Sequence, residues 1–454
     1  MNEQQNHKGF VSKVGLVLAT AGAAVGLGNI WRFPTTTGEN GGAAFILVYV
    51  LFTLIICVPG MVAEFIVGRN GACAAKQAYT KAGGKKAWGW IGIIGMIACS
   101  VILGFYNVIA GWTLYYLGMS VGDQVLGDPK HVEEGFGVLM SSPWIPSLMG
   151  IVFMLLTHAI IVRGVQNGIE KASKVMMPVF FVLLLVLIAA GFTLPGAWKG
   201  VEFVFKPDFS KVTADVMFEA LGQAFFSLSL GAACLCTYAS YFKKDVNLVT
   251  STAQIVSIDM SVAILAGLMV FPAVFAVGME PNAGPGLVFL TLPNVFYQAF
   301  PYGVAYVISI LFYALLALAA LTSTISLHEI GTAVIAEECK MDRKKSAWVV
   351  TVCCSVITVL SALSLGPVPE LSLFGKTLFD NFDMFASNML LPFGAFFTCI
   401  LVGWVMKRET VMNELTSEGR IPRSAAFVNI FFFLIRFVCP ISIVVIFLYK
   451  MGVL

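Results

Sequence analysis

The sequence predicts an all-α polytopic membrane protein, and three observations support this fold class. Hydrophobic residues make up 58% of the 454-residue chain and charged residues only 12%, whereas soluble domains carry roughly 45–50% apolar and 25% charged residues. Apolar runs of about 20 residues, long enough to cross a bilayer as helices, recur along the chain. Two of these runs contain interruptions of small and polar residues at comparable places. The formal net charge of +3 gives no reason to expect a nucleic-acid partner.

Eleven membrane-spanning helices are predicted from the apolar runs. In chain order they cover 12–34, 42–68, 88–118, 148–163, 173–194, 216–241, 250–277, 303–337, 346–363, 380–405 and 426–449. Each run is apolar over most of its length and is bounded by polar or turn-forming residues. The whole chain, 1–454, is therefore expected to be a single transmembrane domain surrounded by the lipid bilayer.

Basic residues mark one side of the membrane. Lys85 and Lys86 follow the second predicted span, Lys243 and Lys244 follow the sixth, and similar groups follow the fourth, eighth and tenth. Short loops rich in Lys and Arg stay in the cytoplasm. The sequence therefore predicts a cytoplasmic N-terminus in a cell inner (plasma) membrane and, with eleven spans, an extracytoplasmic C-terminus.

The first and sixth predicted spans are interrupted at 24–29 (AVGLGN) and 227–232 (SLSLGA). Each glycine costs a helix interior about 1 kcal/mol, and in lipid the freed backbone groups need partners, so such breaks are tolerated where the backbone lines a cavity. Because the breaks are five spans apart, they indicate two inverted five-helix repeats around a binding site at mid-membrane. These repeats would cover 12–195 and 216–405, with 426–449 as an additional span. Close helix packing on small residues is the alternative interpretation.

Longer motifs surround both breaks. They read AVGLGNIWRFP from Ala24 and ENGGAAF from Glu39, then GQAFFSLSLG from Gly222 and ALTSTIS from Ala320. Together they resemble the neurotransmitter:sodium symporter family, over the chain from Phe10 to about Met406. The eleven-span count resembles the prokaryotic amino-acid transporters of that family. The resemblance implies alternating access driven by sodium.

The resemblance also implies a substrate site between the two breaks. There the backbone of Gly26, Leu27 and Gly28 would come close to an amino acid, and the hydroxyl of Tyr106 would contact its carboxylate. The other expected substrate-binding residues are Ala24, Ile102, Phe226, Ser227, Ser229, Ala232, Ser323 and Leu327.

Two positions indicate the kind of substrate. Gly26 stands where amine-carrying relatives have an aspartate, and Ala232 stands where relatives often carry a large side chain. A neutral amino acid with a bulky apolar or aromatic side chain is therefore expected. A collapsed backbone around Ala232 would favour leucine or methionine instead.

Two sodium sites are implied by the same resemblance. The first would use the Ala24 carbonyl, the side chains of Asn29, Ser227 and Asp259, and the substrate carboxylate; the second would use the carbonyls of Gly22, Val25 and Ala319 and the hydroxyls of Thr322 and Ser323. An acidic residue inside a span, such as Asp259, is costly and marks function. Chloride-dependent relatives carry asparagine at this position, so no chloride requirement is expected.

Charged pairs are expected to close the two ends of the pathway. Arg32 and Asp383 match the outer gate of the family. At the inner gate, His7 stands where relatives have an arginine, and Lys8 with Glu337 is the candidate replacement pair.

Other function classes predict other patterns. A channel needs filter rings or a pore-lining stripe, and a membrane enzyme needs catalytic pairs or metal-ligand spacing. Neither pattern is visible, so we expect no enzymatic activity. A substrate sensor on the same fold stays open, as do the monomeric and homodimeric states.

Overall fold

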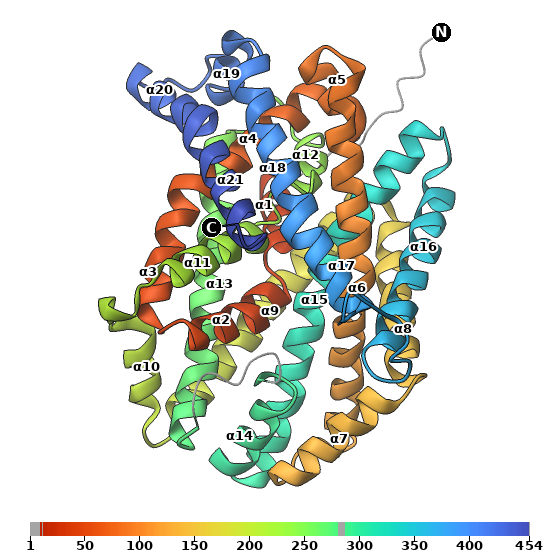
Figure 1. Cartoon of the computed structure of the whole chain (residues 1–454), viewed down its shortest axis with the longest axis vertical. Helices are drawn as coiled ribbons and strands as arrows, with labels where there is room; N and C mark the ends of the chain where they lie inside the picture. Colours follow the sequence, from red (N-terminus) through yellow and green to blue (C-terminus); the bar gives the residue numbers. More distant parts are fainter. Residues whose placement is uncertain (1–9, 11, 280–286, 454) are drawn as a thin grey trace.

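Helices occupy nearly every segment of the computed structural model, which describes residue 10 and residues 12–279 and 287–453 (Figure 1). The labels η mark short turns of 3-10 or π helix. The first half of the chain forms α1 (Lys13–Ala24), η1 (Gly28–Arg32), α2 (Phe33–Glu39), α3 (Ala43–Phe52), η2 (Thr53–Cys57), α4 (Val58–Gly71), α5 (Ala75–Gly83), η3 (Lys86–Trp88), α6 (Gly89–Val121), α7 (Pro129–Ser141), α8 (Ile145–Ile161), η4 (Val165–Glu170), α9 (Lys171–Phe192), α10 (Ala197–Phe205) and η5 (Phe209–Lys211).

The second half adds more helices and a short antiparallel hairpin of two strands, which the sequence analysis did not predict. Its elements are α11 (Ala214–Ser227), α12 (Cys234–Ala239), α13 (Leu248–Ala276), α14 (Thr291–Ala299), α15 (Tyr302–Glu338), α16 (Arg343–Ser364), β1 (Ser372–Leu373), β2 (Lys376–Thr377), α17 (Leu378–Asp383), η7 (Met384–Leu390), α18 (Leu391–Ile400), η8 (Leu401–Val405), α19 (Arg408–Leu415), α20 (Ala425–Phe433), η9 (Leu434–Val438) and α21 (Cys439–Lys450).

The predicted all-α membrane fold is confirmed, whereas the count of eleven spans stays a prediction. Eight helical segments of the described residues are long and apolar enough to cross a membrane, or up to ten if each of two bent helix pairs is one span. The predicted span 216–241 falls on α11 and α12, which are separated by the break and are both short.

The outer surface of the bundle is apolar, as a lipid-facing surface must be. On α9, for example, Val179, Val182, Leu185 and Val186 are 44–61% exposed. Such a surface would drive association in water, but in a bilayer it meets acyl chains of similar polarity.

Both predicted helix breaks are present. The first span bends by 52° between α1 and the helix that follows it, because Val25 adopts an extended conformation and helix resumes at Gly28. In the second break, Ser229, Gly231 and Ala233 have φ of 51°, 82° and 54°. This left-handed backbone ends α11 before α12 begins.

The second break packs directly against α18. A Cβ atom on Gly231 would lie 1.9 Å from the carbonyl oxygen of Leu391, and one on Gly394 would lie 2.1 Å from the carbonyl oxygen of Gly231. Only glycine on both sides lets the two backbones approach this closely.

Candidate functional site

A cavity lies between the two breaks, where α6 and α15 also contribute side chains. Its lining consists of small residues and apolar side chains with a few hydroxyls: Ala23, Ala24, Gly26, Gly28, Ile102, Tyr106, Phe226, Ser227, Ser229, Ala232, Cys234, Ser323, Ser326, Leu327 and Leu391. The structure therefore brings together all the predicted substrate-binding residues except Leu27 in one lining. The backbone N–H of Leu27 donates to the hydroxyl of Tyr106 at 3.1 Å, so Leu27 joins the site through this bond.

Gly26 is the tightest point of the site. A Cβ atom there would lie 2.0 Å from the Oγ of Ser323 and 3.2 Å from the hydroxyl of Tyr106. A side chain at this position is therefore incompatible with the present position of the Ser323 hydroxyl and crowds that of Tyr106. The glycine thus brings the first break, α6 and α15 to one point.

A buried acidic residue braces the second break. The carboxylate of Glu64, on α4, accepts a hydrogen bond from the backbone N–H of Gly231 at 2.5 Å. Glu64 is only 1% exposed. No role was predicted for Glu64 from the sequence, although an acidic residue within a span was itself a signal. Its partner is a backbone group that sequence spacing does not reveal.

The residues predicted for the first sodium site meet around Asp259, which is fully buried. The hydroxyl of Ser227 donates to its carboxylate, with oxygen–oxygen distances of 3.0 and 2.9 Å. The amide nitrogen of Asn29 donates to the same carboxylate at 2.8 Å. The hydroxyl of Tyr49, which the sequence analysis missed, donates at 3.3 Å. No Lys or Arg in the described part of the chain pairs with Asp259.

Such an arrangement can bind a hard cation. It offers carboxylate and hydroxyl oxygens, which such ions prefer, and a buried carboxylate is costly without a compensating charge. The amide oxygen of Asn29 accepts a hydrogen bond from the backbone N–H of Gly26 at 3.1 Å. Ala24 lines the cavity beside this cluster.

The residues predicted for the second sodium site meet where α15 crosses the first break. The hydroxyl of Thr322 lies 2.9 Å from the carbonyl oxygen of Val25 and 2.8 Å from that of Ala319. Gly22 lies beside them, since a Cβ atom there would be 3.5 Å from the Cβ of Thr322. Ser323 lines the substrate cavity, beside Gly26.

Ser387 lies between the two predicted outer-gate residues, as a hydrogen-bond partner of one and a cavity neighbour of the other. The guanidinium of Arg32 lies 4.1 Å above the ring centroid of Phe226. Asp383 accepts a hydrogen bond from Ser387 at 2.7 Å, and Ser387 and Arg32 line one small cavity next to the substrate cavity. Arg32 and Asp383 form no ion pair among the ion pairs of the described residues.

The predicted inner gate is only partly described. Glu337 accepts a hydrogen bond from the backbone N–H of Ala74 at 2.6 Å, just before α5. Its predicted partner Lys8, like His7, lies outside the described residues.

A contact at the start of α1 was not predicted from the sequence. Both the backbone N–H and the hydroxyl of Ser12 donate to the carboxylate of Glu170, at 3.2 and 3.0 Å. Lys174 pairs with the same carboxylate at 2.7 Å. This contact ties the beginning of α1 to the beginning of the fifth predicted span. Residues 158 positions apart in sequence give no local signal of such a contact.

Comparisons with known proteins agree with this geometry. The model of the sodium:neurotransmitter symporter family matches residues 7–127 and 145–453. The chain is 40% identical to the sodium-dependent transporter YhdH of Bacillus subtilis over the full length of both proteins. It is 34% identical to a sodium-dependent transporter of Haemophilus influenzae over 96% of each, and 25% identical to the sodium- and chloride-dependent taurine transporter of Bos taurus over 87% of this chain and 71% of that protein.

A solved structure is similar over almost the entire chain. The crystal structure of MhsT in complex with L-phenylalanine matches with a TM-score of 0.89 and 38% identity, covering 98% of this chain and 99% of that one. The match supports the all-α fold with broken spans described above. The chain thus belongs to the sodium:neurotransmitter symporter family and is a sodium-dependent, multi-pass membrane transporter rather than an enzyme.

Proposed function

We propose that this transporter is a sodium-coupled symporter that imports a neutral amino acid with a bulky apolar or aromatic side chain, without requiring chloride. The lining of the cavity carries this proposal. It offers backbone groups of the first break and the hydroxyl of Tyr106, which suit the amino and carboxylate groups. Ile102, Phe226 and Leu327 add apolar side chains to the same lining.

Charge at the cavity supports the same substrate class. No Asp, Glu, Lys or Arg is among the described residues that line it. A charged substrate side chain would therefore lose its hydration without gaining a partner, whereas an apolar one gains about 25 cal/mol per Å² of buried surface. The complex of MhsT with L-phenylalanine is consistent with such a substrate.

The oxygen clusters around Asp259 and Thr322 support two proposed sodium sites. In the first, the substrate carboxylate would complete the ligand set, which couples substrate binding to sodium. In the second, sodium would join α1 to α15 and so favour one arrangement of the first break. The repeats 12–195 and 216–405, with 426–449 as an extra span, would move against each other during alternating access, with the N-terminus in the cytoplasm and the C-terminus outside. Arg32 and Asp383 would close the outer path, and Glu337 with Lys8 the inner one.

Uptake into proteoliposomes tests the proposal. An inward sodium gradient should drive accumulation of labelled phenylalanine, leucine or tryptophan, and replacing chloride by gluconate should leave the rate unchanged. Sodium-dependent binding without accumulation would identify a sensor instead. Competition among the twenty amino acids should favour a large apolar one; if glycine or alanine competes best, the substrate class is wrong.

Ala232→Phe tests the size of the pocket. Ala232 is fully buried at the cavity, so an added ring should shift preference towards smaller amino acids. Cys99→Ala is a matched control, since Cys99 bonds to the carbonyl of Ala232 from outside the lining and its loss should leave the preference unchanged.

A further inference from the structure

An arginine lies within the last membrane-spanning segment, away from the transport site. Arg436 is part of η9, within the continuous apolar segment Ala425–Tyr449. An arginine at membrane depth is costly unless a carboxylate or another polar group compensates it. In the described part of the chain Arg436 has no ion pair, and its buried Nε has no hydrogen-bond partner.

Aromatic rings hold this guanidinium instead. It lies 4.1 Å from the ring centroid of Trp404 and 5.5 Å from that of Phe437. The indole N–H of Trp404 donates to the carbonyl oxygen of Arg436 at 3.0 Å. Gly403 permits this approach, since a Cβ atom there would lie 2.9 Å from the Cα of Arg436. The arginine is thus fixed in place while its charge stays uncompensated.

A second arginine lies against the same aromatic group. The guanidinium of Arg408, the first residue of α19, lies 5.6 Å from the ring centroid of Phe432, and that of Arg436 lies 6.0 Å from the same centroid. Arg408 donates to the amide oxygen of Asn429 at 2.6 Å and forms no ion pair among the described residues. We call Trp404, Arg408, Phe432, Arg436 and Phe437 the arginine–aromatic surface.

This surface is formed by residues of η8, α19, α20 and η9, and Figure 1 shows α19 and α20 at the upper edge of the bundle. Apolar side chains continue from it along the outside of the last span: Phe433 is 54% exposed and Ile441 62% exposed. Two positive charges therefore stand beside an exposed apolar strip on the membrane-facing side of the molecule.

We propose that the arginine–aromatic surface binds an anionic phospholipid. The phosphate would be shared between Arg408 and Arg436, and an acyl chain would lie along Phe433 and Ile441. Guanidinium groups match phosphate oxygens with paired hydrogen bonds, and basic pockets between spans are suited to anionic headgroups. A soluble anion fits less well, because the apolar strip would remain uncovered and Arg436 lies within the membrane segment. The inference is independent of the substrate proposed above.

The test measures lipid retained by the full-length protein. The protein is reconstituted in vesicles of equal parts phosphatidylcholine and phosphatidylglycerol, extracted in mild detergent, and its bound lipid is quantified by mass spectrometry. Wild-type protein should retain phosphatidylglycerol in preference to phosphatidylcholine. Arg408→Gln and Arg436→Gln should each lower the retained phosphatidylglycerol about fivefold. Arg420→Gln is the matched control, because Arg420 is exposed and pairs with Glu418 at 3.6 Å; its retention should equal that of wild type.

Three results would overturn the proposal. They are equal retention of both lipids by wild-type protein, unchanged retention in Arg408→Gln, and displacement of phosphatidylglycerol by millimolar inorganic phosphate, which would indicate a site for soluble anions. Arg408→Gln alone decides if Arg436→Gln fails to elute as a single folded species, since Arg408 is exposed and its replacement disturbs no buried packing.

Discussion

At the scale of single residues, the proposed ion requirement depends on Asp259. Its carboxylate is fully buried and contacts only neutral side chains among its described hydrogen-bond partners. We predict that Asp259→Asn weakens the apparent sodium affinity at least tenfold and makes uptake partly dependent on chloride, because a mobile anion then replaces the fixed one. Sodium titrations of substrate binding in chloride and in gluconate measure both effects.

Tyr49→Phe is the control for this variant. It removes one hydroxyl donor to Asp259 and keeps the negative charge. Chloride independence should persist in Tyr49→Phe. If Asp259→Asn remains chloride-independent and keeps its sodium affinity, the carboxylate is not a sodium ligand.

A comparison of variants at Thr322 and Thr324 distinguishes an effect on sodium binding from an effect on helix packing. Thr322 contacts the carbonyl oxygen of Val25 across the first break, whereas Thr324, on the same helix, bonds to Thr157 away from it. Replacing either threonine by valine nearly preserves volume and removes one hydroxyl. We predict that Thr322→Val raises the sodium concentration for half-maximal binding several-fold, and that Thr324→Val leaves it unchanged. Equal titration curves for both variants would show that Thr322 is not a ligand of the second sodium ion.

At the scale of elements, the start of α1 is held by Glu170. Ser12 donates two hydrogen bonds to this carboxylate, and its hydroxyl also accepts from the N–H of Gly15 as the helix cap. We predict that Glu170→Ala releases the start of α1. Amide hydrogen exchange in 13–24 should then become faster, and the apparent affinity for external substrate should fall because the inner side opens more often.

The control removes another partner of Glu170, the cation of Lys174. Lys174→Gln removes the cation that pairs with Glu170 but leaves both Ser12 bonds in place. Exchange in α1 should stay at the wild-type rate. Faster exchange in Lys174→Gln, with none in Glu170→Ala, would contradict a role of the Ser12 contact.

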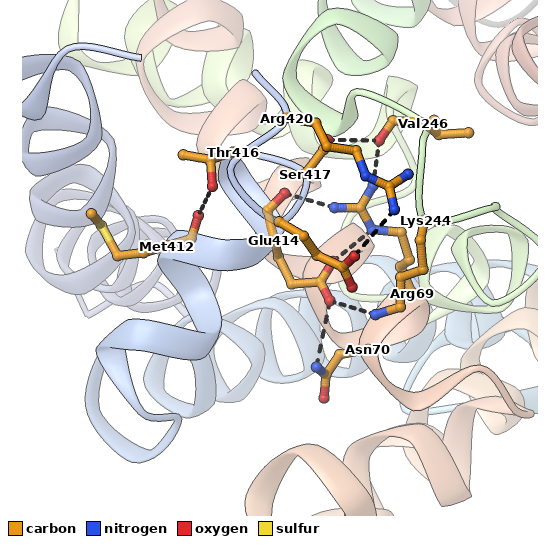
Figure 2. Close-up of polar contacts among 10 residues, drawn as sticks. Arg69, Asn70, Lys244, Val246, Met412, Glu414, Thr416, Ser417 and Arg420 are labelled. Carbon is orange, nitrogen blue, oxygen red and sulfur yellow. Dashed lines mark hydrogen bonds and ion pairs between the residues drawn. The ribbon is translucent and has the colours of Figure 1, made fainter. Parts of the chain in front are cut away.

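At the scale of the whole molecule, one buried arginine joins three distant segments, as Figure 2 shows. Arg69 lies in the last turn of α4, is 2% exposed, and pairs with Glu414 of α19 at 2.6 Å. It also donates to the carbonyl oxygens of Glu414 and Val246. Lys244 reaches the same carboxylate at 3.0 Å from the loop after α12.

We predict that Arg69→Met lowers the free energy of unfolding by about 3–5 kcal/mol, because the buried carboxylate and carbonyl groups lose their partner. Lys244→Met should cost less than about 1 kcal/mol, since Lys244 is half-exposed. Thermal unfolding in detergent compares the two variants. Similar melting temperatures for both would show that the buried pair adds little to the stability of the fold.

The fold was predictable because its signals are local, and the cavity residues were predictable because short continuous motifs carry the resemblance to the family. The breaks, the glycines at 26 and 28, and the hydroxyls at 322 and 323 all lie in short continuous motifs, and the structure gathers these residues as expected. The contacts of Glu64, Glu170 and Arg69 were missed because each joins segments more than 150 residues apart. A charged residue in an apolar run predicts that a partner exists, but only the packed helices identify it. The span count was uncertain for a related reason, since broken helices are too short to be recognised by length alone.

The contact between Gly231 and Gly394 limits how the substrate site can change shape. With no side chain between them, the second break and α18 touch backbone to backbone. A gap opened by one ångström would hold neither a side chain nor a water molecule, and would forfeit a large part of the attraction between the two surfaces. The closed contact is therefore favoured over any slightly separated arrangement of the two backbones. A rearrangement that separates these two backbones would therefore occur in one abrupt step rather than gradually. Bound ions would then change how long the transporter stays in each arrangement more than they change its average structure.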